Sequence, residues 1–513
     1  MESIYLMVVI SVAVPLLLKH FLNYRRANQT LPPGPPTFPI ISNVLWIRKS
    51  LAQLLPIIRN LHAEYGPMIT LHIGHRPAIF IADRSLAHQA LVQNGAVFAD
   101  RPEAVATRNI FTSDQRIISS AHYGPSWRIL RRNLTSEILH PSRVKSYSHA
   151  RNWVLQILRN RLVSVSKSGT PVRALEEFQY AMFCLLVFMC FGDKLDQSQV
   201  KEIEKVGRAM LMSVSNSNAL NFWPRVTKIV FRRRWEELLQ LRRDQEDVLI
   251  PLIRARKKIN EVRKQNKAKE DCQKEKDEHA LCYVDTLFDL QLPDEKRKLT
   301  EEEMVSLCNE FLNAGTDSTS TALEWIMANL VKYPHIQEKL FMEMKTRMGD
   351  EKAEEVKEED LERMPYLKAI VLEGLRRHPP GHVVLPHAVT ENMKLGGHII
   401  PKNAIINFMV ADMGLDPKVW EDPMAFKPER FEGETVDITG SKEIKMMPFG
   451  VGRRICPGYG LAILHLEYFV ANLVWTFEWK AVDGEDVELS EKQCFTIVMK
   501  KPLQANLFPR VRK

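Results

Sequence analysis

Most of the chain repeats its apolar residues at helical spacing, and only two short regions show the pattern of β-strands. Residues 68–82 contain two apolar, β-branched runs on either side of the sequence GHRP, which predicts a β-hairpin. A second hairpin is predicted over residues 393–409, around Pro401. The pattern therefore predicts a mainly α fold with small β-sheets (α+β).

The N-terminus carries an almost continuous apolar run over residues 4–18, interrupted only by Ser11 and Pro15 and followed by basic residues. A helix needs roughly 20 residues to span a membrane, and the run reaches this length when residues 2–22 are counted. A cleaved signal peptide is the alternative, but the basic start and small-residue cleavage site that it requires are missing. We therefore expect a single retained anchor over residues 1–24, with the chain after it in the cytosol.

Prolines mark the segment after this anchor, which reads LPPGPP over residues 31–36. Proline fixes φ and cannot continue a helix, so the segment predicts a stiff, non-helical hinge. The expected organisation is a transmembrane anchor (1–24), a basic and proline-rich hinge (25–36) and one globular domain (37–513).

One predicted helix is much longer than the others. Thr300 and Glu303 have the spacing of a capping box, and the helical pattern then continues until Pro334 ends it. At about 1.5 Å per residue, this helix would be roughly 50 Å long. Its middle reads AGTDST over residues 314–319, and glycine and hydroxyl residues are poor choices for a helix interior. Two interpretations stay open, namely a helix locally opened over a buried cofactor and a close helix crossing at Gly315.

An aromatic pair, Phe222 and Trp223, lies in a short break between helical stretches, and basic residues follow at Lys228 and 232–234. An aromatic tip with basic flanks suits a membrane interface. Core packing of the two aromatic rings is an equal alternative.

Composition and charge set wide limits. The chain has 513 residues, of which 45% are hydrophobic and 26% charged, as in an ordinary globular protein. The net charge of +9 favours anionic surfaces in general, but we expect no nucleic-acid partner because no zinc-finger, homeodomain or RNA-binding signature occurs. The 7 cysteines are irregularly spaced and include no CxxC pair, so neither a disulfide framework nor a zinc site is expected, and most of them are predicted to be small buried hydrophobic residues.

Only Cys456 has unusual neighbours, in the segment PFGVGRRICPGYG over residues 448–460. The glycines allow a close approach of the backbone or a positive φ, and Arg454 offers a fixed cation. Pro457 and a predicted helix follow, and the start of a helix favours a thiolate. From the residues alone, a buried and unreactive thiol is the alternative.

Five motifs carry a resemblance to a known family. The sequence FGVGRRICPG is similar to the haem-binding loop of the cytochrome P450 family, with Phe449, Gly452, Arg454, Cys456 and Gly458 at its fixed positions. The other four motifs, in the family's order, are WxxxR at Trp127 and Arg131, AGTDS at residues 314–318, ExxR at Glu373 and Arg376, and PERF at residues 428–431. Short sequences such as LPPGPP, AGTDST and VMKKPL resemble those of the microsomal plant A-type members of the family. The resemblance extends from about residue 31 to the C-terminus.

The resemblance implies a cytochrome P450 fold, with the long central helix over haem b and residues 37–513 as a haem-thiolate catalytic domain. Cys456 would bind the iron as a thiolate, which favours cleavage of the O–O bond. Phe449 would shield the sulfur, and backbone amides around Gly458 would donate hydrogen bonds to it. The donors expected for the two haem propionates are Trp127, Arg131, Arg454 and His387, with a surface position as the alternative for His387.

The resemblance also implies a structural and a catalytic group. Glu373, Arg376 and Arg430 would form a buried charged triad behind the haem. Asp317 and Ser318 would relay protons to bound dioxygen, although Ser318 stands where the family usually has threonine.

The implied activity is monooxygenation of a small, largely apolar organic substrate, in plant specialised or catabolic metabolism. Electrons would come from NADPH through a separate flavoprotein, NADPH-cytochrome P450 reductase, with cytochrome b5 as a further candidate, because the chain has no dinucleotide or flavin fingerprint. Arg128, Arg132 and Arg453 are expected to dock this acidic partner. The expected location is the endoplasmic reticulum membrane, in contact with lipid, with a single pass and a cytosolic catalytic domain.

Two rival functions keep the haem. One is a reductase-independent isomerase or dehydratase, against which the intact Asp317–Ser318 pair argues, and the other is a haem-binding sensor. Family resemblance places the substrate contacts around residues 108–123, 209–220, 310–314, 383–385 and 495–499.

Overall fold

The structure is a computed structural model, and two compact units make up the chain. It describes residues 30–36, 46, 49–73, 76–216, 218–221, 223–269, 281–348, 353–433 and 436–510. The predicted anchor (1–24) and residues 25–29 of the predicted hinge lie outside the described residues. One unit comprises Met1–Pro102 with Leu385–Met409, and the other comprises Glu103–Val384 with Val410–Lys513, so the expected domain 37–513 contributes to both.

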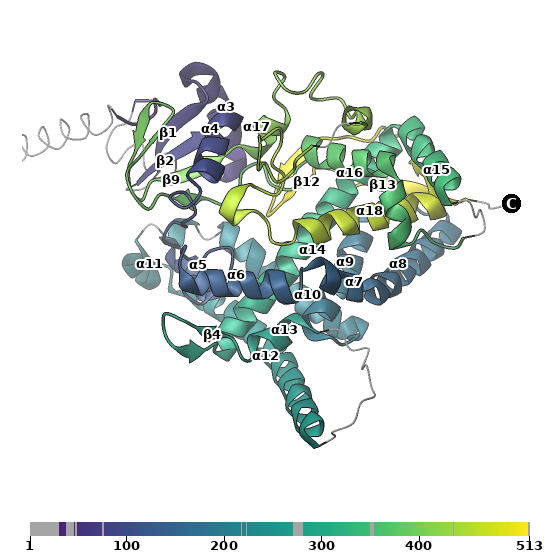
Figure 1. The fold of residues 1–513 in the computed structure, drawn as a ribbon, viewed down its shortest axis with the longest axis horizontal. Helices are drawn as coiled ribbons and strands as arrows, with labels where there is room; N and C mark the ends of the chain where they lie inside the picture. The colour runs from purple at the N-terminus through teal and green to yellow at the C-terminus, as the bar shows by residue number, and fades with distance from the viewer. Residues whose placement is uncertain are drawn as a thin grey trace, which may run out of the picture. The chain divides into compact units, whose positions relative to one another are not determined.

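The first unit is built on a four-stranded sheet with the order β1-β2-β9-β6 (Figure 1). The hairpin predicted at residues 68–82 is confirmed, since β1 and β2 pair antiparallel from Met68 opposite Ile81 to Ile73 opposite Arg76. Strand β9 runs parallel to β2, and β6 runs antiparallel to β9. The elements of this unit are α3 (Leu51–Tyr65), β1 (Met68–Ile73), β2 (Arg76–Ile81), α4 (Arg84–His88), the π-helix η1 (Gln89–Gln93), β6 (His387–Ala388), β7 (Met393–Leu395), β8 (His398–Ile400) and β9 (Ile405–Phe408).

The second predicted hairpin exists, but its predicted turn at Pro401 is wrong. Strands β7 and β8 pair antiparallel, and their turn consists of Gly396 and Gly397, with φ of 55° and 86°. Two successive left-handed residues suit glycine, whereas proline is confined to negative φ. Pro401 follows β8, and the chain then enters β9 of the other sheet.

The described part of the predicted hinge, residues 30–36, is non-helical. It is hydrogen-bonded to strands of the first unit, because Thr70 N donates to Pro33 O (2.9 Å) and Ile399 N donates to Thr30 O (2.8 Å). A side chain at Gly34 would collide with the Thr70 carbonyl, at 2.1 Å from its oxygen. The proline-rich segment therefore packs on the sheet, and the limits of the hinge stay a prediction.

The second unit is mainly helical, and its strands are short. Its helices are α5 (Ala106–Thr112), α6 (Pro125–Glu137), α7 (Pro141–Ser146), α8 (Ser148–Ser168), α9 (Ala174–Phe191), α10 (Gln197–Asn216), η2 (Asn218–Asn221), α11 (Pro224–Val230), α12 (Arg232–Lys269), α13 (Tyr283–Leu287), α14 (Glu301–Lys332), α15 (Pro334–Met348), η3 (Glu358–Arg363), α16 (Pro365–Arg377), α17 (Val410–Gly414), η4 (Pro428–Phe431), η5 (Gly452–Arg454) and α18 (Tyr459–Thr476). Its strands are β3 (Val172–Arg173), β4 (Gln291–Leu292), β5 (Arg297–Lys298), β10 (Phe477–Ala481), β11 (Glu491–Gln493), β12 (Ile497–Met499) and β13 (Gln504–Pro509), of which β10, β13 and β3 form a three-stranded sheet.

Helix α14 is the centre of the second unit, and α9, α16 and α18 pack against it (Figure 1). Its predicted limits are confirmed, because the Thr300 hydroxyl and the Glu303 carboxylate form the capping box and the helix ends at Lys332, before Pro334. The predicted local opening is wrong, since α14 is a continuous α-helix through residues 314–319. A side chain at Gly315 would lie 2.6 Å from Leu186 Cδ1 of α9, so the close helix crossing explains the glycine.

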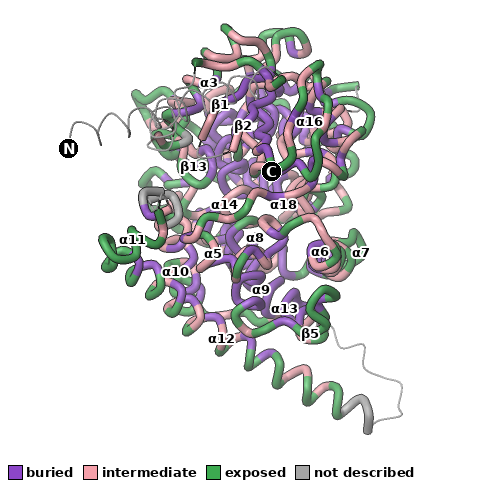
Figure 2. Tube along the Cα trace, turned by 90° about the vertical axis from the view of Figure 1, so that its left-hand side faces the viewer, coloured by how far each residue is buried: buried purple, intermediate pink, exposed green. Residues whose placement is uncertain are grey.

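Helix α9 (Ala174–Phe191) is the single helix within the described residues that is long and apolar enough to span a membrane. Most of it is buried, and it belongs to the hydrophobic core that it shares with α14 and α18 (Figure 2).

The aromatic tip before α11 lies on the surface of the second unit. Trp223 is 66% exposed, so the core-packing interpretation is wrong for this residue, and Phe222 lies outside the described residues. Ile229 and Val230 of α11 are 80% and 65% exposed, and most of the helix is coloured as exposed in Figure 2. An apolar patch, defined by Trp223, Ile229 and Val230, therefore faces outward.

Candidate functional site

Cys456 sits in a tight loop between η5 and α18. Gly450 and Gly452 have φ of 69° and 76°, which turn the chain, and the Cys456 N–H closes the loop on the Phe449 carbonyl at 2.9 Å. The Phe449 ring packs near the Tyr459 ring, with centroids 6.3 Å apart. Helix α18 then begins at Tyr459, so the sulfur lies just before a helix N-terminus as predicted.

The thiol of Cys456 is enclosed by protein and still partly accessible. Burial raises its pKa, while a hydrogen bond from the Gly458 N–H and the positive charge of Arg131 act in the opposite direction. Both opposing effects favour the thiolate. The other described cysteines lack this setting, because Cys184, Cys190, Cys282 and Cys308 are buried free thiols and Cys494 is an exposed one, while Cys272 lies outside the described residues.

Three predicted donors gather beside this loop. Arg131 of α6 donates to the Ile455 carbonyl at 2.6 Å, and burial lowers the pKa of its guanidinium while Cys456 raises it. Arg454 donates to the carbonyls of Ile118 (3.2 Å) and Ala121 (2.6 Å). Its guanidinium stacks over the Trp127 ring at 4.3 Å, and the Trp127 Nε1 donates to the same Ile118 carbonyl at 3.1 Å. Arg131, Arg454 and Trp127 therefore form one cluster with the cysteine loop.

His387, the fourth predicted donor, belongs to the first unit. It lies on β6, is 4% exposed, and its Nδ1 is 2.6 Å from the Phe98 carbonyl oxygen. The alternative of a surface histidine is therefore wrong. Sequence reasoning missed its neighbour Arg101, which is 7% exposed and donates to the carbonyls of Leu385 and Pro386. The local sequence FADRP gave no clear signal of this burial, because the charged Asp100 directly precedes Arg101.

Asp317 and Ser318 lie in the middle of α14. The Ser318 hydroxyl donates to the Ala314 carbonyl at 2.7 Å, so it bonds back to the preceding turn. Burial raises the pKa of Asp317, Arg208 lowers it, and Glu204 raises it again. Ala314 is exposed and both candidate residues are partly accessible, although the helix is otherwise largely buried. These residues therefore face a solvent-accessible space inside the second unit.

A backbone segment connects this face of α14 with the cysteine loop. Glu310 of α14 accepts the N–H groups of Ile118 (2.8 Å) and Ser119 (2.7 Å), while the Ile118 carbonyl accepts Trp127 and Arg454. Both residues fall within the predicted substrate-contact regions 108–123 and 310–314, but the contact between them was not predicted. No local signal marks either residue, because backbone partners are brought together only by the tertiary fold.

Glu373, Arg376 and Arg430 contact one another as predicted. The Arg376 guanidinium donates to both Glu373 oxygens (2.7 and 2.8 Å), and both side chains are fully buried. The Arg430 Nε donates to Glu373 Oε1 at 3.2 Å. The triad ties α16 to η4, and its remaining donors bond to backbone carbonyls.

Comparison with known proteins identifies the family. The family model described as cytochrome P450 matches residues 32–507. Cytochrome P450 89A9 of Arabidopsis thaliana is 50% identical, over 99% of both chains, and an isoflavone 2'-hydroxylase of Glycyrrhiza echinata is 30% identical, over 94% of this chain and 92% of its own. A zebra fish cytochrome P450 solved with progesterone superimposes with a TM-score of 0.73 at 21% identity, over 89% of this chain and 99% of its own. The fold is thus the cytochrome P450 fold, and the chain belongs to the cytochrome P450 family as a plant A-type monooxygenase.

Proposed function

We propose that this chain inserts one oxygen atom of O₂ into a small, largely apolar organic substrate, with Cys456 as the thiolate ligand of haem iron. The observation that carries this proposal is the setting of the sulfur, which receives the Gly458 N–H, lies near Arg131 and precedes a helix N-terminus. The relatives support oxygen insertion in plant specialised or catabolic metabolism, since one of them is named as an isoflavone hydroxylase.

The residues around Cys456 fit a haem. Its sulfur is enclosed yet accessible, as a metal ligand must be. Among the described residues Arg131 makes no ion pair with a carboxylate, and it donates a hydrogen bond to the neutral Ile455 carbonyl. Arg131 and Arg454 would hold the propionates, because burying two carboxylates without donors is costly. Trp127 stays a predicted contact, because its single N–H is already donated to the Ile118 carbonyl. His387 and Phe449 stay predicted cofactor contacts.

When bound, a thiolate-ligated haem supplies activation of dioxygen, with electron density from the sulfur favouring O–O cleavage. The chain's own part is to set the sulfur and the proton supply. The Gly458 N–H and the Arg131 cation stabilise the thiolate and tune its donor strength. Asp317, whose pKa burial raises, holds and passes on protons through the Ser318 hydroxyl on the accessible face of α14.

The electron donor is proposed to be a separate NADPH-dependent flavoprotein reductase, with cytochrome b5 as a further candidate. Arg128, Arg132 and Arg453 are exposed near the cysteine loop. Arg453 donates to the Tyr123 hydroxyl at 2.7 Å, and the Arg128 guanidinium lies 4.9 Å from the same ring. This cationic surface suits an acidic partner. Charge reversal at Arg128 and Arg132 should slow NADPH-driven turnover and spare peroxide-driven turnover, and equal loss of both would reject this docking surface.

The location is proposed to be the cytosolic face of the endoplasmic reticulum membrane, with a single-pass anchor. The apolar patch of Trp223, Ile229 and Val230 supports lipid contact, because basic residues such as Lys228 and Arg233 flank it. Brominated phospholipid in anionic vesicles should quench less fluorescence in Trp223→Phe than in wild type. Equal quenching of the two proteins would show that the patch does not contact lipid.

The deciding experiment is the carbon monoxide difference spectrum of the reduced holoprotein, for wild type beside Cys456→Ala. A strongly red-shifted Soret band in wild type, absent from the variant, is the expected result because only a thiolate ligand produces it. A well-folded, haem-loaded wild type without this band would overturn the proposal. NADPH dependence of turnover then distinguishes monooxygenation from a reductase-independent isomerase or dehydratase.

A further inference from the structure

Arg108 is an enclosed cation of the second unit whose guanidinium makes no hydrogen bond or ion pair within the described part of the chain. Arg108 lies on α5, where desolvation by burial lowers the pKa of its guanidinium and the Glu310 carboxylate raises it. Its side chain is nevertheless exposed. Within the described ranges, no hydrogen bond or ion pair involves this guanidinium. A side chain that is surrounded by protein atoms and is still reached by solvent is expected to face a solvent-accessible space inside the protein.

Among the described residues, an enclosed arginine without a hydrogen-bond partner is unusual. Its guanidinium cannot lose its proton at physiological pH, so burial leaves a charge that needs compensation. The other enclosed arginines use their donors on carboxylates or on backbone carbonyls. Carboxylates pair with Arg151, Arg242, Arg256 and Arg376, whereas Arg131 donates to the Ile455 carbonyl and Arg101 donates to the carbonyls of Leu385 and Pro386. The guanidinium of Arg108 therefore has N–H donors that an anion from outside the chain can accept.

Glu310 does not satisfy the cation. Both of its oxygens accept backbone N–H groups, from Ile118 and Ser119, and no ion pair joins it to Arg108 among the described residues. Glu310, Ala314 and Ser318 are spaced by four residues and share one face of α14. This is the accessible face described above, so Arg108 lies beside the space that the proton-carrying residues also face.

Helix α5 holds the cation in a fixed position. Thr107 exchanges two hydrogen bonds with the Asn221 side chain (3.0 and 2.9 Å), and Phe111 packs into a cluster with Met210 and Trp235. Thr107 and Phe111 thus anchor the helix through positions one residue before and three residues after the cation.

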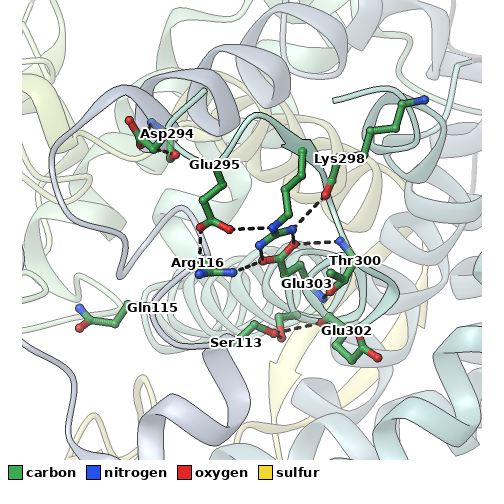
Figure 3. Close-up of polar contacts among 12 residues, drawn as sticks. Ser113, Gln115, Arg116, Asp294, Glu295, Lys298, Thr300, Glu302 and Glu303 are labelled. Atoms are coloured by element: carbon green, nitrogen blue, oxygen red, sulfur yellow. Dashed lines mark hydrogen bonds and ion pairs between the residues drawn. The ribbon is translucent and has the colours of Figure 1, made fainter. Parts of the chain in front are cut away.

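The segment after α5 is held in a strained conformation. Ser113, Asp114 and Gln115 have φ of 46°, 55° and 62°, and such left-handed residues other than glycine cost about 1 kcal/mol or more each. Figure 3 shows how the segment is tied to the N-terminus of α14, with Ser113 donating to the Glu302 carbonyl and Arg116 paired with Glu303. Strain of this kind persists where the surroundings overdetermine it, and it concentrates at ligand sites.

We propose that Arg108 binds a carboxylate of the substrate, so that the substrate is an organic acid with a largely apolar body. This inference rests on the proposed monooxygenase function and specifies the substrate class that the function acts on. The guanidinium matches a carboxylate through two parallel N–H···O bonds, and that pairing would orient the rest of the molecule along α14. Arg108 is then a specificity-determining residue.

The test uses ligands that also report on the iron. Imidazole rings ligate ferric haem and shift its Soret band, so ω-(imidazol-1-yl) derivatives of butanoic, octanoic and dodecanoic acid are titrated beside their primary amides. At one or more of these lengths, wild-type holoprotein should bind the acid about tenfold or more tightly than the amide, as a charge-assisted hydrogen bond implies. Arg108→Gln should abolish that preference, Arg108→Lys should keep part of it, and the exposed control Arg243→Gln should keep all of it.

Three other outcomes are separable. An acid-to-amide ratio that is the same in wild type and Arg108→Gln would overturn the inference while leaving the proposed function intact. Loss of haem from Arg108→Gln, with Arg243→Gln fully loaded, would assign Arg108 to the cofactor and would also overturn it. A wild type that takes up no haem, or whose Soret band does not respond to imidazole itself, would overturn the proposed function, and the inference with it.

Discussion

Arg376 and Arg108 are two enclosed arginines of the same unit with opposite surroundings. Arg376 makes five hydrogen bonds, two to Glu373 and three to the carbonyls of Gly414, Pro423 and Ala425. Arg108 makes none through its guanidinium among the described residues. A cation whose donors are all used holds the fold together, whereas a cation with unused donors remains available for a ligand. The difference separates structural from binding residues without reference to any motif.

The largest expected effect comes from removing the carboxylate partner of Arg376. Glu373→Ala leaves Arg376 buried without a counter-charge, which should destabilise the protein by about 3–5 kcal/mol. We expect little folded holoprotein, measured as haem content and as the midpoint of urea unfolding. Glu432→Ala is the matched control, because its ion pair with Lys339 is exposed and should contribute under about 1 kcal/mol. Normal haem content and an unchanged urea midpoint in Glu373→Ala would show that the ion pair of Arg376 does not stabilise the fold.

His465 gives a third case, an enclosed base that can lose its proton. Burial lowers its pKa to about 3, with Arg151 adding to the effect, and its Nε2 has no hydrogen-bond partner within the described chain. In the unfolded chain this imidazole binds a proton below about pH 6.5, whereas in the folded protein it stays neutral until about pH 3. The free energy of unfolding therefore decreases as the pH falls from about 6.5 toward 3.

Between pH 7 and pH 4, we therefore expect the free energy of unfolding to decrease less in His465→Leu than in wild type. The two decreases should differ by at most about 3 kcal/mol. Urea unfolding at both pH values measures the difference. The exposed His335→Leu should follow the wild type, and an identical pH dependence in His465→Leu would mean that this imidazole is protonated in the folded state.

Substitution of Arg108 should change the stability of the protein only slightly. Arg108→Gln removes a desolvated charge that makes no described hydrogen bond, so the free energy of unfolding should change by less than about 1 kcal/mol, in either direction. Urea unfolding beside Arg376→Gln provides the direct comparison. A loss for Arg108→Gln as large as that for Arg376→Gln would place Arg108 among the structural cations.

The smallest free-energy effect concerns two hydroxyls of α14 that both bond back to a carbonyl. Ser318 is on the accessible face, whereas Ser320 is fully buried and donates to Thr316. Ser318→Thr adds a methyl group that restricts χ1, so proton delivery should be better coupled and less peroxide should be released per NADPH. Ser320→Ala should leave that ratio unchanged, and a peroxide ratio equal to wild type in Ser318→Thr would remove Ser318 from the proton path.

Sequence reasoning succeeded where the determining interactions are local. The limits of α14 follow from the capping residues Thr300 and Glu303 and from Pro334, all within one turn of the helix ends. It failed at Pro401, where the turn formed instead at two glycines with positive φ. The cluster around Cys456 was expected from family motifs, and the structure brings Trp127, Arg131 and Arg454 to the loop.

That Arg108 has no hydrogen-bond partner among the described residues could not be predicted, because it depends on which donors the tertiary fold leaves unused. The same holds for Glu310, whose partners are backbone N–H groups. A sequence shows that a charge exists and does not show whether the fold neutralises it.

The backbone of Ile118 has a consequence for how this enzyme can diversify. Its N–H is bound by Glu310 of the central helix, and its carbonyl is bound by Trp127 and by Arg454 of the cysteine loop. An insertion or deletion that displaced Ile118 would disturb both attachments at once. Because both attachments use backbone atoms, side chains along the segment can be exchanged more readily than the peptide of Ile118 can be displaced.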